Sequence, residues 1–310
     1  MQHSLPMLAR LQQLLVFAWL AALATAVVWP WWAGHPAGSV LAVVTVLAAH
    51  ALWLLLSFAL MRWQNRGDPA PPASWGQWIR AWWGEVQAAP QVFGWRQPFR
   101  SQAEPDFLPP EARGRVGVVL VHGFVCNRGL WTPWLKRLRE ASVPFIAVNL
   151  EPVFGSIDDY PPLIEAAVRQ LEAATGEKPV LVGHSMGGLA IRAWLARHAA
   201  DDRVRSIITI GSPHQGTWLA KWSRLAENGR QMRPGGEWLQ RLAAAEPASR
   251  HQLFLCIYGH GDNIVFPASS ALLPGARSRH IEATAHVEMV HHPLVWAELW
   301  RALGRDASHG

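Results

Sequence analysis

A strand-to-helix junction near the middle of the chain constrains the fold more than any other feature. Residues 180–182 form an apolar, strand-like run, and a helical pattern begins at Met186. Between them, residues 183–187 read Gly-His-Ser-Met-Gly. A serine at such a turn is held in a strained backbone conformation with its hydroxyl above the end of the sheet, and a Cβ at either glycine would clash with the adjoining strand and helix. The junction therefore marks Ser185 as a candidate nucleophile.

Strand and helix patterns alternate on both sides of this junction. Strands alternating with helices of this length are typical of a mostly parallel sheet covered by helices on both faces. We therefore expect an α/β fold over residues 115–310. The predicted strands are 116–121, 144–150, 179–182, 204–210, 253–258 and a short one at 280–282, and the predicted helices include 129–140, 160–174 and a last one that ends at 303.

The loop after the first predicted strand contains a candidate oxyanion hole. It begins His122-Gly123-Phe124. A His-Gly pair in this place commonly supplies a backbone N–H to an oxyanion, here that of Phe124. Met186, at the start of a helix, supplies the second N–H, because the first donors of a helix are unpaired and lie at its positive end. We expect these two N–H groups to act as a pair.

A nucleophilic serine needs a base and an acid that orients the base. In an open parallel sheet these groups gather at the carboxyl ends of strands. Asp262 follows the strand 253–258 and is the predicted acid. His286 lies in the loop after the short run 280–282 and is the predicted base, in preference to His291 and His292, which begin the last helix.

Two apolar segments precede the α/β region. Residues 14–32 and 39–61 contain no charged side chain, and each is long enough to cross a hydrocarbon core of about 30 Å. The short turn 34–38 joins them, so residues 1–66 are predicted to be a transmembrane helical hairpin. Tryptophans lie where an interfacial aromatic belt would be, at positions 29, 31, 32 and 63.

Basic residues predict how this hairpin is oriented. Arg10 precedes it, Arg62 and Arg66 follow it, and its turn has none, so the positive-inside rule places both ends in the cytoplasm. We expect a multi-pass protein of the inner membrane with a cytoplasmic α/β domain. The alternative is a cleaved signal peptide ending near residues 22–26, but that interpretation leaves the second apolar segment unexplained.

Residues 67–114 are predicted to be a linker rich in proline and tryptophan. Within it, Trp75, Trp78, Ile79, Trp82 and Val86 share one helical face, whereas Glu85 lies largely off it. This helix either lies in the membrane interface or packs on the domain core, and the sequence leaves both alternatives open. Residues 90–113 have little periodicity and predict an extended lead-in.

Composition excludes some classes of protein. Half of the residues are hydrophobic, 16% are charged, and the net charge is +6. No nucleic-acid-binding motif accompanies this charge, so membrane lipids with anionic headgroups are the expected partner and nucleic acid is not. The two cysteines, Cys126 and Cys256, adjoin apolar runs and are predicted to be buried thiols.

With these residues assembled, the region from about 115 to 303 resembles a bacterial lipase or esterase of the α/β-hydrolase superfamily. Besides the motifs above, residues 211–217 read Gly-Ser-Pro-His-Gln-Gly-Thr, and lipase-like members have a similar segment after the strand that follows the nucleophile. The resemblance implies an α/β-hydrolase fold, a Ser185–Asp262–His286 triad and hydrolysis of acyl esters. Some such lipases hold a calcium ion near the histidine loop, but residues 268–288 offer only Glu282 and Glu288 as carboxylates, so no metal or cofactor is expected.

An insertion between two predicted strands, about 218–250, combines apolar and basic residues. Its helices are predicted to form a lid that shapes an apolar acyl pocket, or alternatively to pack on the edge of the sheet. We expect substrate contacts from His122, Gly123, His184, Trp218 and Trp222.

These features together predict a membrane-anchored serine hydrolase that cleaves carboxylic esters of lipid-like acyl chains. A thioesterase or an acyltransferase would use the same triad. A non-catalytic transport or scaffold protein on a hydrolase fold is the alternative from another class.

Overall fold

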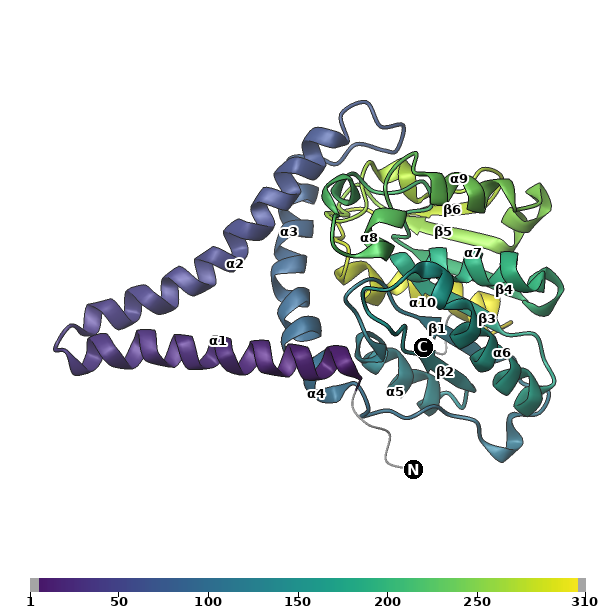
Figure 1. Ribbon diagram of the computed structural model, residues 1–310, viewed down its shortest axis with the longest axis horizontal. Coiled ribbons are helices and arrows are strands. Elements are labelled where there is room, and N and C mark those ends of the chain that lie inside the picture. Colours follow the sequence, from purple (N-terminus) through teal and green to yellow (C-terminus); the bar gives the residue numbers. More distant parts are fainter. Residues whose placement is uncertain (1–5, 306–310) are drawn as a thin grey trace.

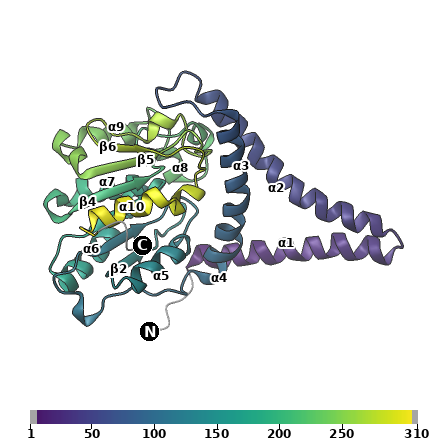
Figure 2. The same cartoon turned by 180° about the vertical axis from the view of Figure 1, so that it is seen from behind.

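The computed structural model describes residues 6–305, which form an α/β domain with a helical arm on one side (Figure 1). The arm and the domain are joined by one long helix, α3, which lies between them in both views (Figures 1 and 2). The helices are α1 Met7–Trp32, α2 Pro36–Gln64, α3 Trp75–Ala89, α4 Gln97–Arg100, α5 Thr132–Glu140, α6 Pro161–Thr175, α7 Met186–His198, α8 Glu227–Gln231, α9 Glu237–Ala244 and α10 Pro293–Ala302. The strands are β1 Val118–Val121, β2 Phe145–Val148, β3 Val180–His184, β4 Ser206–Ile210, β5 Phe254–Tyr258 and β6 Arg277–His280.

The six strands form one parallel sheet in the order β2-β1-β3-β4-β5-β6. The predicted α/β fold is therefore confirmed. Both faces of the sheet are buried, because alternate residues of each strand point to opposite sides. In β1, Val119 and Val121 pack with α6, α7 and α9, whereas Val118 and Leu120 pack with α5 and α10. This arrangement brings the carboxyl ends of all six strands to one edge of the sheet.

The last strand differs from its prediction. The sequence places it at 280–282, but β6 is Arg277–His280. Its residues read Arg-Ser-Arg-His, and the first three are exposed because β6 is at the edge of the sheet. An exposed edge strand has no alternating apolar pattern from which it can be predicted. The strand was predicted too far along the chain because the apolar residue Ile281, which is buried, comes just after it.

Helices α1 and α2 pair with each other and project away from the domain (Figures 1 and 2). Both are long and apolar enough to cross a membrane, by length and composition alone. Ser39 Oγ donates to the carbonyl oxygen of Val27 at 2.5 Å and ties them together near the turn. Most of their large side chains are exposed, so the hairpin offers an apolar surface along most of its length.

The base of the hairpin packs against α3 and the domain. Phe58 and Met61 of α2 are buried in one cluster with Ala81 of α3 and with Phe266 and Ala285 of the domain. Polar contacts secure the same junction. Asn65 Oδ1 accepts from the N–H of Ala268 at 3.0 Å, Asp68 Oδ2 accepts from the N–H of Ser269 at 3.1 Å, and Gln12 Nε2 of α1 donates to Gln97 Oε1 at 2.7 Å.

Helix α3 begins with a capping box, in which the Ser74 side chain accepts from the Gln77 N–H and the Gln77 side chain accepts from the Ser74 N–H. The predicted extended lead-in from residue 90 is wrong for its first part. A π-helix, Pro90–Arg96, continues α3 into α4. Burial of Val92, Gln97 and Pro98 stabilises this segment, and tertiary packing of this kind overrides weak local helix propensity.

Candidate active site

Ser185 lies between β3 and α7 with φ 55° and ψ −129°. A non-glycine residue in this region is strained, and the surrounding structure must hold it there. The N–H of Ser185 donates to the carbonyl oxygen of Ile210 in β4 at 2.9 Å. A Cβ at Gly187 would clash with the carbonyl oxygen of Val121, and one at Gly183 would lie 2.8 Å from the Gly188 nitrogen. The predicted need for both glycines is confirmed.

The two residues predicted to supply oxyanion donors, Met186 and Phe124, are both near the serine in the structure. Met186 is the first residue of α7, so its N–H is among the donors that the helix leaves unpaired. Phe124 is the third residue after β1 and lines the same cavity as Ser185. Gly123 packs directly against the serine, because a Cβ at this position would lie 2.6 Å from the Ser185 Cβ. Only glycine lets the loop after β1 approach the nucleophile this closely.

His122 fixes the start of the loop after β1 through two hydrogen bonds to backbone. Its Nε2 accepts from the N–H of Leu150 at 2.9 Å, so Nδ1 carries the proton and donates to the Gly123 carbonyl oxygen at 2.9 Å. Burial lowers the pKa of His122 to about 4, which keeps the ring neutral and this pattern fixed. Its ring is bonded to backbone and is not among the side chains that line the cavity.

Asp262 and His286 form a buried pair at the ends of β5 and β6. His286 Nδ1 lies 2.9 Å from Asp262 Oδ2. The other oxygen of Asp262 accepts from the N–H groups of Ile264 at 3.0 Å and Val265 at 2.8 Å. These three bonds fix the carboxylate, and the carboxylate fixes the imidazole ring. Gly211 lies beside the pair with φ +53°, and a Cβ there would lie 2.7 Å from Asp262 Oδ2.

Charges around His286 favour its protonated form. Burial alone would lower its pKa, but the charge of Asp262, the hydrogen bond to it and the charge of Glu85 together raise the pKa above its ordinary value. Ser185 and His286 line one cavity, although no hydrogen bond joins them among the described residues. Such bonds often form only when substrate binds.

Three other histidines near the site have different partners. His184 Nε2 donates to the His286 carbonyl oxygen at 3.2 Å, and the two rings lie 4.6 Å apart. Burial lowers the pKa of His184 well below its ordinary value. His291 Nε2 accepts from Arg96 at 2.9 Å, and His292 caps α10 through its Nδ1. Of these four histidines, only His286 is hydrogen-bonded to a carboxylate among the described residues, and only His286 and His184 line the cavity with the serine.

The cavity at Ser185 has a volume of about 470 Å³. Few polar side chains line it, and its wall is mostly apolar. Such a cavity suits an apolar ligand with one reacting polar group. The insertion 218–250 contributes Leu219, Ala220 and Met232 to this wall. Trp218 and Trp222 are not among the lining residues: Trp218 stacks on Phe266, and Trp222 is 67% exposed.

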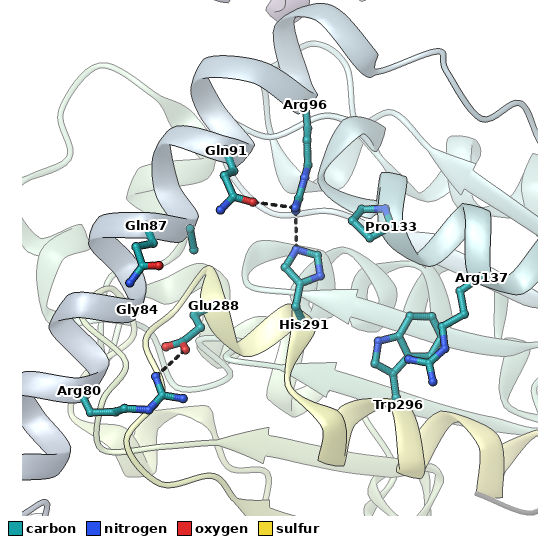
Figure 3. A pocket seen from close by; sticks show the side chains of 11 residues that line it. Arg80, Gly84, Gln87, Gln91, Arg96, Pro133, Arg137, Glu288, His291 and Trp296 are labelled. Atoms are coloured by element: carbon teal, nitrogen blue, oxygen red, sulfur yellow. Dashed lines mark hydrogen bonds and ion pairs between the residues drawn. The ribbon is translucent and has the colours of Figure 1, made fainter. Parts of the chain in front are cut away.

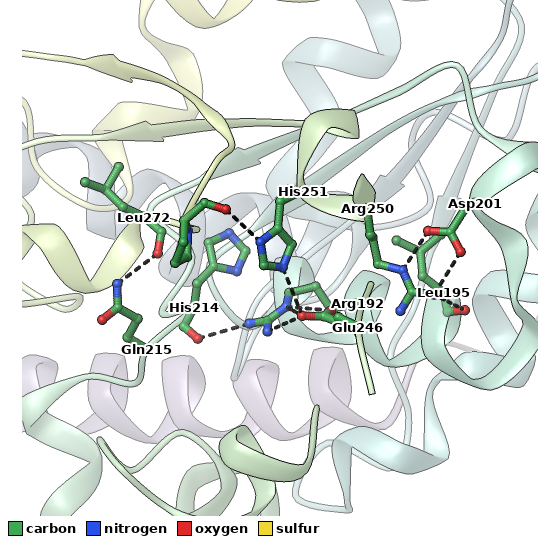
Figure 4. Close-up of polar contacts among 10 residues, drawn as sticks. Arg192, Leu195, Asp201, His214, Gln215, Glu246, Arg250, His251 and Leu272 are labelled. Atoms are coloured by element: carbon green, nitrogen blue, oxygen red, sulfur yellow. Dashed lines mark hydrogen bonds and ion pairs between the residues drawn. The ribbon is translucent and has the colours of Figure 1, made fainter. Parts of the chain in front are cut away.

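A buried ion pair holds the insertion and the loop 211–217 in place (Figure 4). Arg192 of α7 and Glu246, just after α9, lie 2.6 Å apart and are almost fully buried. Arg192 also donates to the His214 carbonyl oxygen at 3.0 Å, and His251 Nε2 lies 3.2 Å from Glu246. These contacts join α7, which starts just after Ser185, to two segments that contribute residues to the cavity wall. The two predicted buried thiols, Cys126 and Cys256, are also confirmed.

Glu85 of α3 is the residue that sequence reasoning missed. The sequence indicates a polar, outward position, but only 2% of Glu85 is exposed. Its carboxylate lines the cavity and accepts from the N–H of Val287 at 3.2 Å and from that of Glu288 at 3.2 Å. Burial raises its pKa to about 7, against the opposing effects of His286 and of these two bonds.

Contacts on either side of Glu85 attach α3 and the π-helix that follows it to residues 288–291 (Figure 3). Arg80 Nη1 lies 3.0 Å from Glu288 Oε1, and Arg96 reaches His291. A Cβ at Gly84 would clash with the Glu288 carboxylate, so glycine permits this close approach. In the sequence, the only sign of this buried contact is Gly84 next to Glu85 within a tryptophan-rich helix.

Comparisons with known proteins agree with this architecture. The model of the alpha/beta hydrolase fold family matches residues 117–258, a region that contains Ser185 but ends before Asp262. No curated protein matches the chain. The mature Bacillus licheniformis lipase BlEst2 is 18% identical with a TM-score of 0.54, and the match covers 61% of this chain and 92% of that one. Aspergillus fumigatus lipase B is 20% identical with a TM-score of 0.57, and the match covers 65% of this chain and 55% of the Aspergillus protein.

At these identities the two lipases establish the fold alone. The chain has the α/β-hydrolase fold, preceded by two long apolar helices. It spans about half the length of the Aspergillus lipase.

Proposed function

We propose that this protein is a membrane-anchored serine hydrolase that cleaves carboxylic esters of lipid-like acyl chains. The observation that carries this proposal is the set of groups that surround Ser185. Ser185, in its strained turn, and His286, which is paired with the buried Asp262, both line one largely apolar cavity of about 470 Å³. A nucleophile, an oriented base and an apolar cavity are the parts that acyl-ester hydrolysis requires.

In the proposed mechanism, His286 accepts the Ser185 proton while Oγ bonds to the ester carbonyl carbon. The N–H groups of Phe124 and Met186 stabilise the oxyanion, and Asp262 stabilises the imidazolium. The C–O bond to the alcohol then breaks, and the alcohol leaves with the proton from His286. Water next gives a proton to His286 and attacks the acyl-enzyme, and the Ser185 oxygen recovers that proton as the carboxylic acid is released.

The membrane anchor is part of the proposal. Helices α1 and α2 would span the inner membrane, with the hydrolase domain on the cytoplasmic side, where Arg10, Arg62 and Arg66 would meet anionic lipid headgroups. The insertion 218–250 would act as a lid, which is supported by the three apolar side chains that it contributes to the cavity. Trp218, Trp222 and His184 remain proposed substrate contacts, as does the backbone at His122 and Gly123.

Hydrolysis of p-nitrophenyl esters of graded chain length tests the proposal. We expect the detergent-solubilised full-length protein to hydrolyse them, and Ser185→Ala to lose at least about 10⁴-fold in kcat. A fluorophosphonate probe should label the wild-type protein and leave Ser185→Ala unlabelled. Equal rates in the two proteins, or equal labelling, would remove the hydrolase assignment.

A further inference from the structure

We propose that the N-terminal helices complete the acyl-chain subsite, and that the substrate is a bilayer lipid whose acyl chain reaches Ser185 sideways from the membrane. This inference rests on the proposed function. Three apolar residues from outside the hydrolase domain line the cavity at Ser185, beside Glu85: Leu54 of α2, Ala89 of α3 and Phe93 of the π-helix that follows α3. A cavity formed by the domain alone would lack this apolar wall.

The position of Leu54 along α2 fits the edge of a bilayer. The helical rise of about 1.5 Å per residue places it about 27 Å from Pro36, at the turn of the hairpin. Because a hydrocarbon core is about 30 Å thick, Leu54 lies near the side of the core that faces the domain. The acyl carbonyls of lipids lie at this boundary. On α1 the same rise places Gln13 about 29 Å from Trp32, and Gln13 bonds to the Pro98 carbonyl oxygen of the domain-side segment.

The surfaces beside the cavity also suit a lipid environment. Leu52, Trp53 and Leu56 flank Leu54 and are 61%, 72% and 54% exposed, so α2 turns Leu54 inward and its neighbours outward. Helix α3 buries Ala81 and Glu85 toward the domain and leaves exposed a row of large apolar side chains, Trp75, Ile79 and Trp83. An exposed row of this kind is typical of a helix in the membrane interface.

The arrangement of the arm indicates the side from which a lipid acyl chain would reach the cavity. Helices α1 and α2 leave the molecule on the side where α3 covers the domain (Figures 1 and 2). The cavity wall made by Leu54, Ala89 and Phe93 is therefore the wall that faces the bilayer. A long acyl chain bound at Ser185 would extend along this wall into hydrocarbon, whereas a short chain would contact only the domain. Chain-length selectivity should depend on Leu54.

The test uses the full-length protein in phosphatidylcholine vesicles. It compares kcat/KM for p-nitrophenyl butyrate with that for p-nitrophenyl palmitate dissolved in the same bilayer. In Leu54→Trp the larger ring should obstruct the subsite, reducing kcat/KM at least tenfold for palmitate and at most threefold for butyrate. The matched control is Leu56→Trp, which adds the same ring on the exposed face of α2 and should change neither value more than twofold.

Labelling of Ser185 by a small fluorophosphonate shows whether each variant retains an intact site. Leu54→Ala provides a second variant for the case in which Leu54→Trp does not fold. It removes packing against the chain and should lower the palmitate-to-butyrate ratio at least threefold.

The other possible results of these experiments would contradict either this inference or the proposed function. Retained palmitate hydrolysis in Leu54→Trp, or an equal loss on both esters in protein that is still labelled, overturns the inference. An unchanged ratio in Leu54→Ala, or a loss in Leu56→Trp equal to that in Leu54→Trp, overturns it as well. A wild-type protein no more active than Ser185→Ala on either ester contradicts the proposed function instead, and this inference falls with it.

Discussion

Replacing Glu85 by glutamine tests whether α3 acts on the His286 loop through a charge. The carboxyl is 2% exposed and has a pKa of about 7, compared with an ordinary 4.5. An acid with a raised pKa in the folded state makes folding less favourable as pH rises from 4.5 through 7, because the charged form is the one that burial opposes. The gap corresponds to about 3 kcal/mol. Glutamine removes this cost and retains an oxygen that accepts from the Val287 N–H.

We therefore expect the stability of the wild-type protein relative to Glu85→Gln to fall between about pH 5 and pH 8. At pH 8 Glu85→Gln should be the more stable protein, by up to about 3 kcal/mol. The same substitution should change catalysis. His286 must be neutral to accept a proton, and the charge of Glu85 helps to raise its pKa. Without that charge, the acid limb of log kcat/KM should move to lower pH.

The assay is kcat/KM for p-nitrophenyl butyrate from pH 5 to 9, together with melting temperatures over the same range. Glu85→Ala, which lacks the acceptor as well, should lose about tenfold in kcat, and Glu85→Gln should recover most of this loss. Glu288→Gln is the control, because it removes a carboxylate of the same loop that is paired with Arg80. Profiles of rate and stability that coincide for the wild type and Glu85→Gln would refute the coupling.

Two further predictions follow from the buried pairs. Asp262→Asn should reduce kcat about 10⁴-fold, since an amide does not hold His286 in the required tautomer, and the loss should appear in kcat rather than KM for butyrate esters. Melting experiments should show that Glu246→Gln destabilises the protein by about 3–5 kcal/mol, because it leaves Arg192 buried without its counter-charge. Glu140→Gln, which breaks an exposed pair with Lys136, should cost less than about 1 kcal/mol, and equal losses in the two variants would contradict this reasoning.

The parts of the site that could be predicted are those whose signal is local. The turn at Ser185 is encoded in consecutive residues, since a buried strand, two glycines without space for a Cβ and a helix start all adjoin it. Asp262 and His286 could be identified because each follows a strand, and parallel strands bring their carboxyl ends together. Strand β6 was misplaced by three residues because its exposed edge position removes the alternation on which such predictions depend.

The contribution of the N-terminal arm could not be predicted, and the reason is physical. Glu85 lies about 200 residues before the N–H groups that it binds, and a glutamate on an amphipathic helix ordinarily faces water. Its burial depends on where α3 packs, and no local pattern contains that information. Leu54 could not be predicted for a related reason. It is one leucine among many in an apolar helix, and the sequence does not distinguish a leucine that lines a cavity from one that faces lipid. Leu54 belongs to the apolar hairpin and Glu85 to the helix that joins the hairpin to the domain, and α2 and α3 pack on each other. A change in how these two helices pack on the domain would therefore alter the cavity wall and the His286 loop together.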